Sequence, residues 1–242
     1  MKAFIPAAGL GTRLGPFTKD KPKALIEVNG KTMLELTVER LKKQGIRQFM
    51  LNVHHFSQQV IQYLENKNNF GVEIKISDES AELLDTGGAI QKAADFFQGT
   101  EPVLVHNVDV ISEVDFSQLE KYHSSKKALA TLCVRKRKSS RALLFNDEME
   151  LTGWTNKHTN QFKWVTHPVS NFRSFAYSGI YLANPAFATL LPFTGKFSII
   201  DAWLEMAERE KIIGYLDESA LWFDLGTPEK IREAEKVLGK SG

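Results

Sequence analysis

The sequence lacks the cysteine pairs and long apolar runs that mark several classes of protein. Cys133 is the one cysteine among 242 residues, so no disulfide can form within the chain. It lies in an apolar run at residues 128–134, where we expect a small buried side chain of a strand rather than a nucleophile. No stretch approaches the roughly 20 apolar residues that span a bilayer, and the N-terminal run is too short for a signal peptide. We therefore expect a cytoplasmic protein that has no membrane partner.

The sequence also lacks an excess of charge of either sign. Its 31 basic and 29 acidic residues give a formal net charge of +2. Such a chain has no global field to attract nucleic acid, so no nucleic-acid partner is expected and any anion site must be local. The sequence shows no internal repeat, low-complexity tract or linker. We therefore expect a single domain over residues 1–242.

The first half of the chain, residues 1–125, alternates short β-rich runs with helical patterns, which is typical of βαβ units and a mainly parallel sheet. We expect strands at residues 3–7, 47–53, 72–77 and 102–106, and helices at residues 32–44, 57–67, 86–97 and 115–125. Ser57 and Thr86 are the expected N-caps of their helices.

The second half, residues 126–242, is less regular and fits an insertion that covers a site. The expected elements are strands at 129–134, 142–145, 150–154, 162–165, 175–183, 212–216 and 221–223, and helices at 199–210 and 228–238. The whole pattern predicts an α/β fold with a mixed, mainly parallel central sheet.

A glycine-rich segment at residues 7–23 carries the strongest local signal. Gly9, Gly11 and Gly15 follow the first expected strand, and their backbone N–H groups are free of large side chains, as in the loops that bind phosphate. The Walker A pattern and the dinucleotide fingerprint do not match here. Pro16 and Pro22 predict an extended loop instead of a helix directly after the glycines.

Four cations surround this glycine loop within eleven residues. They are Arg13, Lys19, Lys21 and Lys23. Guanidinium and ammonium groups beside an anion-binding loop suit a polyphosphate ligand. The spacing therefore favours phosphate binding over a purely structural turn.

Two carboxylates stand where apolar strands end. Asp109 follows the strand 102–106, and Asp224 lies between the apolar run at 221–223 and the Gly-Thr-Pro start of the last helix. Open α/β sheets place ligands at the carboxyl ends of strands, and two carboxylates are a usual protein contribution to a Mg²⁺ site. Each residue taken alone is also compatible with an ordinary turn.

A third motif, Thr86-Gly87-Gly88, opens an expected helix. Two successive glycines in a first turn cost about 1 kcal/mol each relative to alanine. Capping by Thr86 explains one glycine but not both, which indicates close approach of a ligand.

Together these motifs resemble the sugar-1-phosphate nucleotidylyltransferase family, whose signature is Ala-Ala-Gly-x-Gly-Thr-Arg-Leu followed by Pro-Lys. Residues 7–14, 22–23, 86–88, 109 and 224–227 match its motifs in the family's order. The resemblance implies a Rossmann-like nucleotide-binding core in residues 1–125, a sugar-binding lid and second metal ligand in 126–242, and one Mg²⁺. Val108 stands where the family usually has glycine, which leaves details of the sugar pocket open.

The resemblance also assigns roles to residues. It implies catalytic roles for Arg13 and Lys23 and metal ligation by Asp109 and Asp224. The nucleotide would contact Ala7, Ala8, Gly9, Gly11, Thr12 and Gly88, and the sugar would contact Asn107, Ser178 and Gly179. The partners that the resemblance implies are a nucleoside triphosphate and a sugar-1-phosphate. The sequence leaves open whether the protein is a monomer or a dimer.

The chain resembles the compact uridylyltransferases of the family. This resemblance favours UTP and an N-acetylated amino sugar-1-phosphate, such as N-acetylmuramate-1-phosphate, as the substrates. GTP with mannose- or heptose-1-phosphate is the alternative. A cytidylyltransferase acting on choline phosphate or a polyol phosphate shares the glycine loop but fits the Thr86–Gly88 motif less well. A non-catalytic sugar-nucleotide sensor is the alternative of another class, and the metal carboxylate pair disfavours it.

Overall fold

The computed structural model describes residues 1–239, which form two compact units. Unit 1 comprises Met1–Leu83, His106–Glu113 and the residues from Ser219 onward, and unit 2 comprises Leu84–Val105 and Val114–Glu218. Each unit is thus discontinuous in the sequence, and the two units do not coincide with the halves 1–125 and 126–242. That a single domain spans residues 1–242 stays a prediction.

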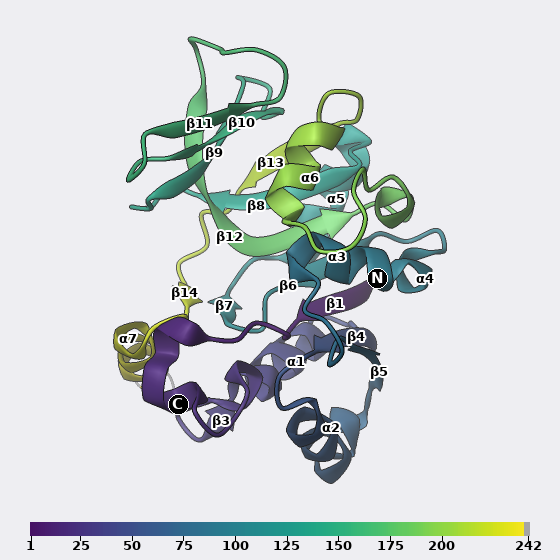
Figure 1. Cartoon of the computed structure of the whole chain (residues 1–242), viewed down its shortest axis with the longest axis vertical. Coiled ribbons are helices and arrows are strands. Elements are labelled where there is room, and N and C mark those ends of the chain that lie inside the picture. Colours follow the sequence, from purple (N-terminus) through teal and green to yellow (C-terminus); the bar gives the residue numbers. More distant parts are fainter. Residues whose placement is uncertain (240–242) are drawn as a thin grey trace. The chain divides into compact units, whose positions relative to one another are not determined.

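A parallel sheet with the order β1-β4-β5 forms the centre of unit 1 (Figure 1). Its strands are β1 (Lys2–Pro6), β4 (Gln48–Val53) and β5 (Glu73–Asp78). In this register Ile5 lies opposite Leu51, and Leu51 lies opposite Ile76. Helices α1 (Met33–Lys43) and α2 (Ser57–Asn66) follow β3 and β4 in the chain, as the helical periodicity of these segments predicts.

Short elements complete unit 1. The strands β2 (Glu27–Val28) and β3 (Lys31–Thr32) form a hairpin, and β7 (Val110–Ser112) pairs antiparallel with β14 (Trp222–Asp224). The last helix, α7 (Pro228–Leu238), is capped by the side chain of Thr227. Strands β2, β3 and β7 were not predicted, because two or three residues show no periodicity.

The glycine-rich segment is not the extended loop that its prolines predict. Residues Thr12–Thr18 form the 3-10 helix η1, with Gly15 out of helical conformation, and Lys23–Leu25 form η2. Gly11 adopts a left-handed conformation and its carbonyl accepts from the Leu14 N–H at 2.8 Å. The Leu14 side chain is fully buried, which anchors the turn and overrides the preference for an extended chain.

A mixed sheet with the order β11-β10-β9-β12-β6 runs through unit 2, where β8 also pairs with β12 and β13 pairs parallel with β8. The strands are β6 (Val103–His106, whose last residue belongs to unit 1), β8 (Ala130–Arg135), β9 (Arg141–Phe145), β10 (Leu151–Asn156), β11 (Gln161–Trp164), β12 (Arg173–Ala183) and β13 (Ile212–Leu216). The helices of unit 2 are α3 (Asp85–Lys92), α4 (Ala94–Phe97), α5 (Phe116–Lys126) and α6 (Ile199–Met206). The 3-10 turn η4 (Phe187–Thr189) also belongs to unit 2, whereas η3 (Asn68–Gly71) belongs to unit 1.

Two expected N-caps are wrong. The helix α2 begins directly at Ser57 after Phe56, which has a left-handed backbone, and the Ser57 hydroxyl accepts a hydrogen bond from Ser80. The helix α3 begins at Asp85, and Thr86 Oγ1 accepts from the backbone N–H of Ile199 at 3.0 Å. In both cases the hydroxyl serves a contact distant in the sequence.

The expected α/β fold class is confirmed. Cys133 is fully buried in β8, as expected, and burial raises the pKa of its thiol well above the ordinary value. Among residues 1–239, none of the helices has the length and apolar character needed to cross a membrane.

Candidate active site

The glycine loop follows the end of β1, and its residues Gly9 and Leu10 are exposed. Ala7 and Ala8 are buried, whereas Gly9 is exposed and a Cβ added to it would meet no atom within 4 Å. Gly11 has φ of 63°, and a Cβ there would lie 2.8 Å from Thr18 Cγ2. Gly11 is therefore required by the turn itself, while the space over Gly9 is open to a ligand.

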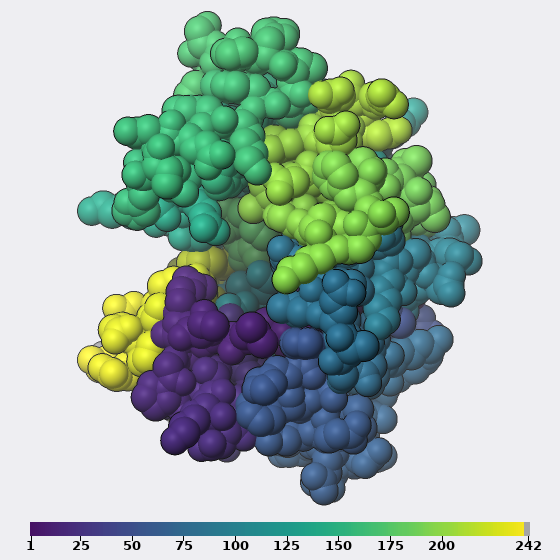
Figure 2. Space-filling view, in the orientation of Figure 1, coloured from purple at the N-terminus to yellow at the C-terminus, as the bar shows by residue number. Residues whose placement is uncertain are grey.

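Arg13 lies beside the Asp224 motif. A Cβ added to Gly226 would lie 2.6 Å from Arg13 Nη2 and 2.7 Å from Asp224 Oδ1, so both groups lie against the backbone of Gly226. Figure 2 shows the N-terminal segment in purple beside helix α7 in yellow, on the surface of unit 1. Residues more than 200 positions apart in the sequence thus bring a guanidinium and a carboxylate together.

Both carboxylate oxygens of Asp224 accept hydrogen bonds. The backbone N–H of Gly226 donates to Oδ1 at 2.9 Å, and Lys230 Nζ donates to Oδ2 at 2.8 Å. Burial raises the pKa of Asp224, but the hydrogen bond and charge of Lys230, the Gly226 amide and the charge of Arg13 outweigh it, so the pKa is lowered. Asp224 is consequently held as a carboxylate.

Asp109 forms an ion pair with Lys23, and both side chains are largely buried. The backbone carbonyl of Asp109 accepts from the Leu225 N–H at 2.8 Å, and Asp224 lies opposite Val110 in the pairing of β14 with β7. The sequence motifs at Lys23, Asp109 and Asp224 therefore meet within unit 1.

A buried hydrogen-bonded chain lies behind the glycine loop. The backbone N–H of Ala7 donates to Asn52 Oδ1 at 2.7 Å, and Asn52 Nδ2 donates to Glu79 Oε1 at 2.8 Å. Asn52 and Glu79 are almost entirely buried. This chain ties the start of the loop to β4 and to the end of β5.

The remaining predicted ligand contacts fall in both units. Asn107 is half-buried in unit 1 between β6 and β7, while Gly88, Ser178 and Gly179 belong to unit 2. Gly179 has φ of 80° in an irregular part of β12, and Ser178 is fully buried there. The ligand contacts of these four residues stay predictions.

Packing within unit 2 accounts for both glycines of the Thr86–Gly88 motif. A Cβ at Gly87 would lie 2.2 Å from the ring of Phe197, and a Cβ at Gly88 would lie 2.1 Å from the carbonyl oxygen of Gly195. The Gly87 N–H also donates to the Phe197 carbonyl at 2.9 Å. The two glycines therefore need no ligand to explain them.

Sequence reasoning missed three residues of unit 1 that support the site: Asn52, Glu79 and Lys230. Asn52 is a polar residue in the apolar strand β4, and that interruption of the pattern was the available signal. Lys230 stands in the first turn of α7, where a cation opposes the helix dipole. No signal of similar strength marks Glu79.

Metal ligation by Asp109 and Asp224 stays a prediction. Among residues 1–239, no three histidine, cysteine or acidic side chains form a metal-ligand group. Asp109 and Asp224 each form an ion pair with a lysine: Asp109 with Lys23, and Asp224 with Lys230. Two carboxylates are sufficient protein ligands for Mg²⁺ when phosphate oxygens and water supply the remainder.

The parallel β1-β4-β5 sheet, with a glycine loop at the end of its first strand and a paired set of cations and carboxylates, defines a nucleotide-binding α/β protein. The model of the nucleotidyl transferase family matches residues 2–241. The chain therefore belongs to the nucleotidyl transferase family, among its sugar-1-phosphate nucleotidylyltransferases.

Two relatives match nearly the whole chain. The N-acetylmuramate alpha-1-phosphate uridylyltransferase of Caulobacter vibrioides is 29% identical over 99% of this chain and 97% of its own length. The D-glycero-alpha-D-manno-heptose 1-phosphate guanylyltransferase of Aneurinibacillus thermoaerophilus is 30% identical over 98% of each chain. The chain spans only 61% of the length of the mannose-1-phosphate guanyltransferase of Yarrowia lipolytica, to which it is 29% identical.

A solved structure confirms the fold. HddC from Yersinia pseudotuberculosis, complexed with GMP-PN, superposes with a TM-score of 0.77 at 21% identity, over 98% of this chain and 99% of that chain. The Rossmann-like architecture expected from the sequence is thus shared with a nucleotide-bound protein.

Proposed function

We propose that the protein transfers UMP from UTP to an N-acetylated amino sugar-1-phosphate such as N-acetylmuramate-1-phosphate, releasing pyrophosphate and a nucleotide-sugar for the cell wall. The meeting of the glycine loop, Arg13, Lys23 and the two acidic residues in unit 1 carries the reaction class. The full-length similarity to a uridylyltransferase supports the choice of substrates.

In this reaction an oxygen of the sugar phosphate attacks the α-phosphorus of the triphosphate in line, and the bond to pyrophosphate breaks. No covalent intermediate on the protein is needed, so catalysis consists of positioning and charge stabilisation. The backbone N–H groups of Gly9–Thr12 and the guanidinium of Arg13 bind the β- and γ-phosphates and stabilise the departing pyrophosphate.

Lys23 acts between the reacting phosphates. Its ammonium group is held at Asp109 before substrates bind, which keeps a positive charge where two anions must approach each other. Asp109 and Asp224 would hold Mg²⁺, which would polarise the α-phosphate and offset the charge of both reactants.

The nucleoside and sugar contacts follow the family motifs. Ala7, Ala8 and Gly88 would line the nucleoside, Asn107, Ser178 and Gly179 would face the sugar, and residues 126–242 would provide the sugar-binding lid. A cytoplasmic location stays a prediction, and so does the absence of nucleic-acid and membrane partners. The oligomeric state stays open between monomer and dimer.

GTP with heptose-1-phosphate is the second candidate substrate pair, and mannose-1-phosphate is a further acceptor for GTP. The heptose-1-phosphate guanylyltransferase of Aneurinibacillus thermoaerophilus is as similar to this chain as the uridylyltransferase and also matches it over nearly its full length. A sugar-nucleotide sensor is less well supported, because a binding protein has no need of two cation-paired carboxylates at the phosphate loop.

Pyrophosphate release in the presence of Mg²⁺ tests the proposal. The assay crosses UTP, GTP, CTP and dTTP with N-acetylmuramate-, N-acetylglucosamine-, mannose- and heptose-1-phosphate. We expect release with UTP and an N-acetylated sugar; release with GTP and heptose- or mannose-1-phosphate establishes the second candidate. Binding of a triphosphate without release from any pair overturns the proposed reaction and favours the sensor.

A further inference from the structure

Three cations face two carboxylates in the site of unit 1. Lys23 pairs with Asp109, Lys230 pairs with Asp224, and Arg13 lies against Gly226 beside the Asp224 carboxylate. The site without ligands therefore carries an excess of positive charge, although its two carboxylates are the groups proposed to bind a divalent cation. A free cation is repelled by such a site until some of its positive charge is neutralised.

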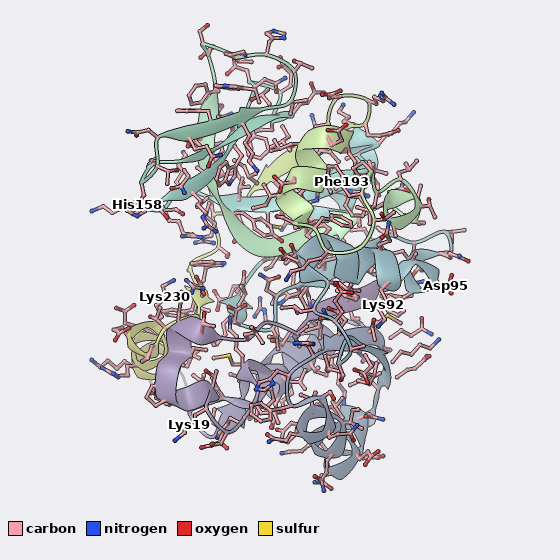
Figure 3. All side chains as sticks on the ribbon, in the orientation of Figure 1. Lys19, Lys92, Asp95, His158, Phe193 and Lys230 are labelled. Atoms are coloured by element: carbon pink, nitrogen blue, oxygen red, sulfur yellow. The ribbon has the colours of Figure 1, made fainter. Side chains whose placement is uncertain are left out.

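Lys230 does not serve the stability of its own helix. It lies in the first turn of α7, where the positive end of the helix dipole disfavours a cation, and Thr227 and Glu229 already supply the cap and the acidic first-turn residue. Its Nζ instead reaches Asp224 Oδ2 at 2.8 Å, and Figure 3 labels Lys230 beside β14. The contact with Asp224 is thus the interaction that accounts for the position of this side chain.

We propose that Lys230 is the resident counter-cation of Asp224, which holds the carboxylate in place and must release Oδ2 before a divalent metal ion can bind. The inference rests on the proposed metal site of the nucleotidylyl transfer. Lys230 is a positioning residue here, because it acts through the carboxylate of Asp224.

Metal uptake then depends on the triphosphate. A triphosphate in the glycine loop brings about four negative charges to Arg13, Lys23 and Lys230, which reverses the sign of the site. The Lys230 side chain is 38% exposed, against 22% for Asp224, so the ammonium group can turn towards phosphate without being desolvated. Asp224 Oδ2 would thus become available to a divalent metal ion when the nucleotide is bound, because Lys230 then turns to the phosphates.

Direct titration of Mn²⁺ by electron paramagnetic resonance tests this inference on the full-length protein, with and without UTP and always without sugar-1-phosphate. Lys230→Met removes the charge at nearly constant volume, and Lys230→Gln is a second neutral variant. Lys230→Arg retains the charge. Lys236→Met makes the same charge change at an exposed position in the last turn of α7 and is the matched control.

We expect the two neutral variants to bind Mn²⁺ roughly 1.5- to fivefold more tightly than the wild type when UTP is absent, the range for loss of one partly exposed ionic competitor. The strengthening of Mn²⁺ binding by UTP should shrink by the same factor. Lys230→Arg and Lys236→Met should bind as the wild type does. Thermal unfolding of each variant shows that the fold is retained.

Unchanged or weaker Mn²⁺ binding in both neutral variants overturns the role of Lys230. Asp224→Asn separates this failure from that of the proposed metal site. If Asp224→Asn loses Mn²⁺ binding while the neutral Lys230 variants are unchanged, the metal site stands and the counter-cation does not. If Asp224→Asn binds Mn²⁺ as the wild type does, both the metal site and the inference are overturned.

Discussion

The backbone N–H of Leu225 donates a 2.8 Å hydrogen bond to the backbone carbonyl of Asp109. This bond extends the pairing of β14 with β7, in which Asp224 lies opposite Val110. The two acidic residues of the site therefore lie on backbone segments that are fixed to each other. A change that removes only the charge of one carboxylate should leave this framework intact.

Asp109→Asn and Arg13→Ala should each lower turnover by about 10²- to 10³-fold, the typical loss when one charge-stabilising group is removed from an active site. Asparagine keeps the shape of Asp109, and Arg13 is exposed, so neither change should unfold the protein. Pyrophosphate release under saturating substrates measures the effect. Lys43→Ala, at an exposed position in the last turn of α1, is the control. Near-normal turnover of a variant removes its residue from the proposed machinery.

Gly9→Ala should weaken triphosphate binding without a loss of stability. The added methyl group meets no protein atom within 4 Å and so projects into the space where phosphate is expected. The KM for the triphosphate should rise, while the unfolding temperature stays within the error of the wild type. A wild-type KM would mean that phosphate does not approach this part of the loop.

Gly11→Ala is the structural counterpart of that change. Its φ of 63° and the 2.8 Å approach of a Cβ to Thr18 Cγ2 predict a loss of about 1–3 kcal/mol of stability. Gly9 and Gly11 are thus expected to be glycines for different reasons, phosphate approach at Gly9 and backbone conformation at Gly11. Equilibrium unfolding and enzyme kinetics of the two variants together distinguish these reasons.

The sequence motifs predict the residues of the candidate site because each motif joins a residue type to a local turn. Arg13, Lys23, Asp109 and Asp224 are recognisable from their neighbours, and the structure places all four in unit 1. The motifs do not show which residues support the site: Lys230 pairs with Asp224 from six positions further on, in the first turn of α7, and Asn52 reaches Ala7 from another strand. Periodicity identifies a strand such as β4 but does not say what a polar residue within it will contact.

The glycine pair at residues 87 and 88 shows the same limit. From the sequence, two helix-breaking residues in a first turn indicate a ligand, because no neighbour in the chain explains them. The structure supplies the neighbour in Gly195 and Phe197, more than 100 residues further on. Close approach of two backbones leaves no mark in the local sequence beyond the glycine itself.

Gly88→Ala decides between these two causes. Helix propensity alone would make the alanine more stable by about 1 kcal/mol, but a Cβ lying 2.1 Å from the Gly195 carbonyl must displace backbone. We therefore expect a net loss of about 1–3 kcal/mol, the cost of overpacking a well-packed site. Urea-induced unfolding without ligands measures it. A more stable variant with a raised KM for the triphosphate would instead support contact with the nucleoside.

Asn52→Leu should destabilise the protein and disturb the glycine loop together. Leucine leaves the Ala7 N–H and the buried Glu79 carboxylate each without its Asn52 partner, at a cost of about 1–3 kcal/mol for each such group. Urea-induced unfolding and the KM for the triphosphate should both change. Gln48→Leu, at an exposed position of the same strand, is the control, and equal effects of the two changes would contradict a specific role for the buried chain.

The pH dependence of stability should reflect His106, which is fully buried at the end of β6. Burial lowers the pKa of His106 to about 4, and the charge of Arg40 lowers it as well. In the unfolded chain the imidazole takes up a proton below about pH 6.5, whereas the folded protein does so only near pH 4. The stability contribution is therefore complete above pH 6.5 and is lost as the pH falls towards 4, by up to about 3 kcal/mol.

Urea-induced unfolding at pH 7.5, 6, 5 and 4.5 measures this loss. His106→Gln should make the curve less steep because glutamine does not titrate, whereas His123, whose pKa burial also lowers to about 4, still does. His158→Gln removes an exposed histidine from a turn and should leave the curve of the wild type unchanged. Equal acid sensitivity in the wild type and in His106→Gln would show that this imidazole does not govern stability between pH 4.5 and 6.5. The buried histidine would then be protonated alike in the folded and unfolded chains, contrary to the effect of its burial.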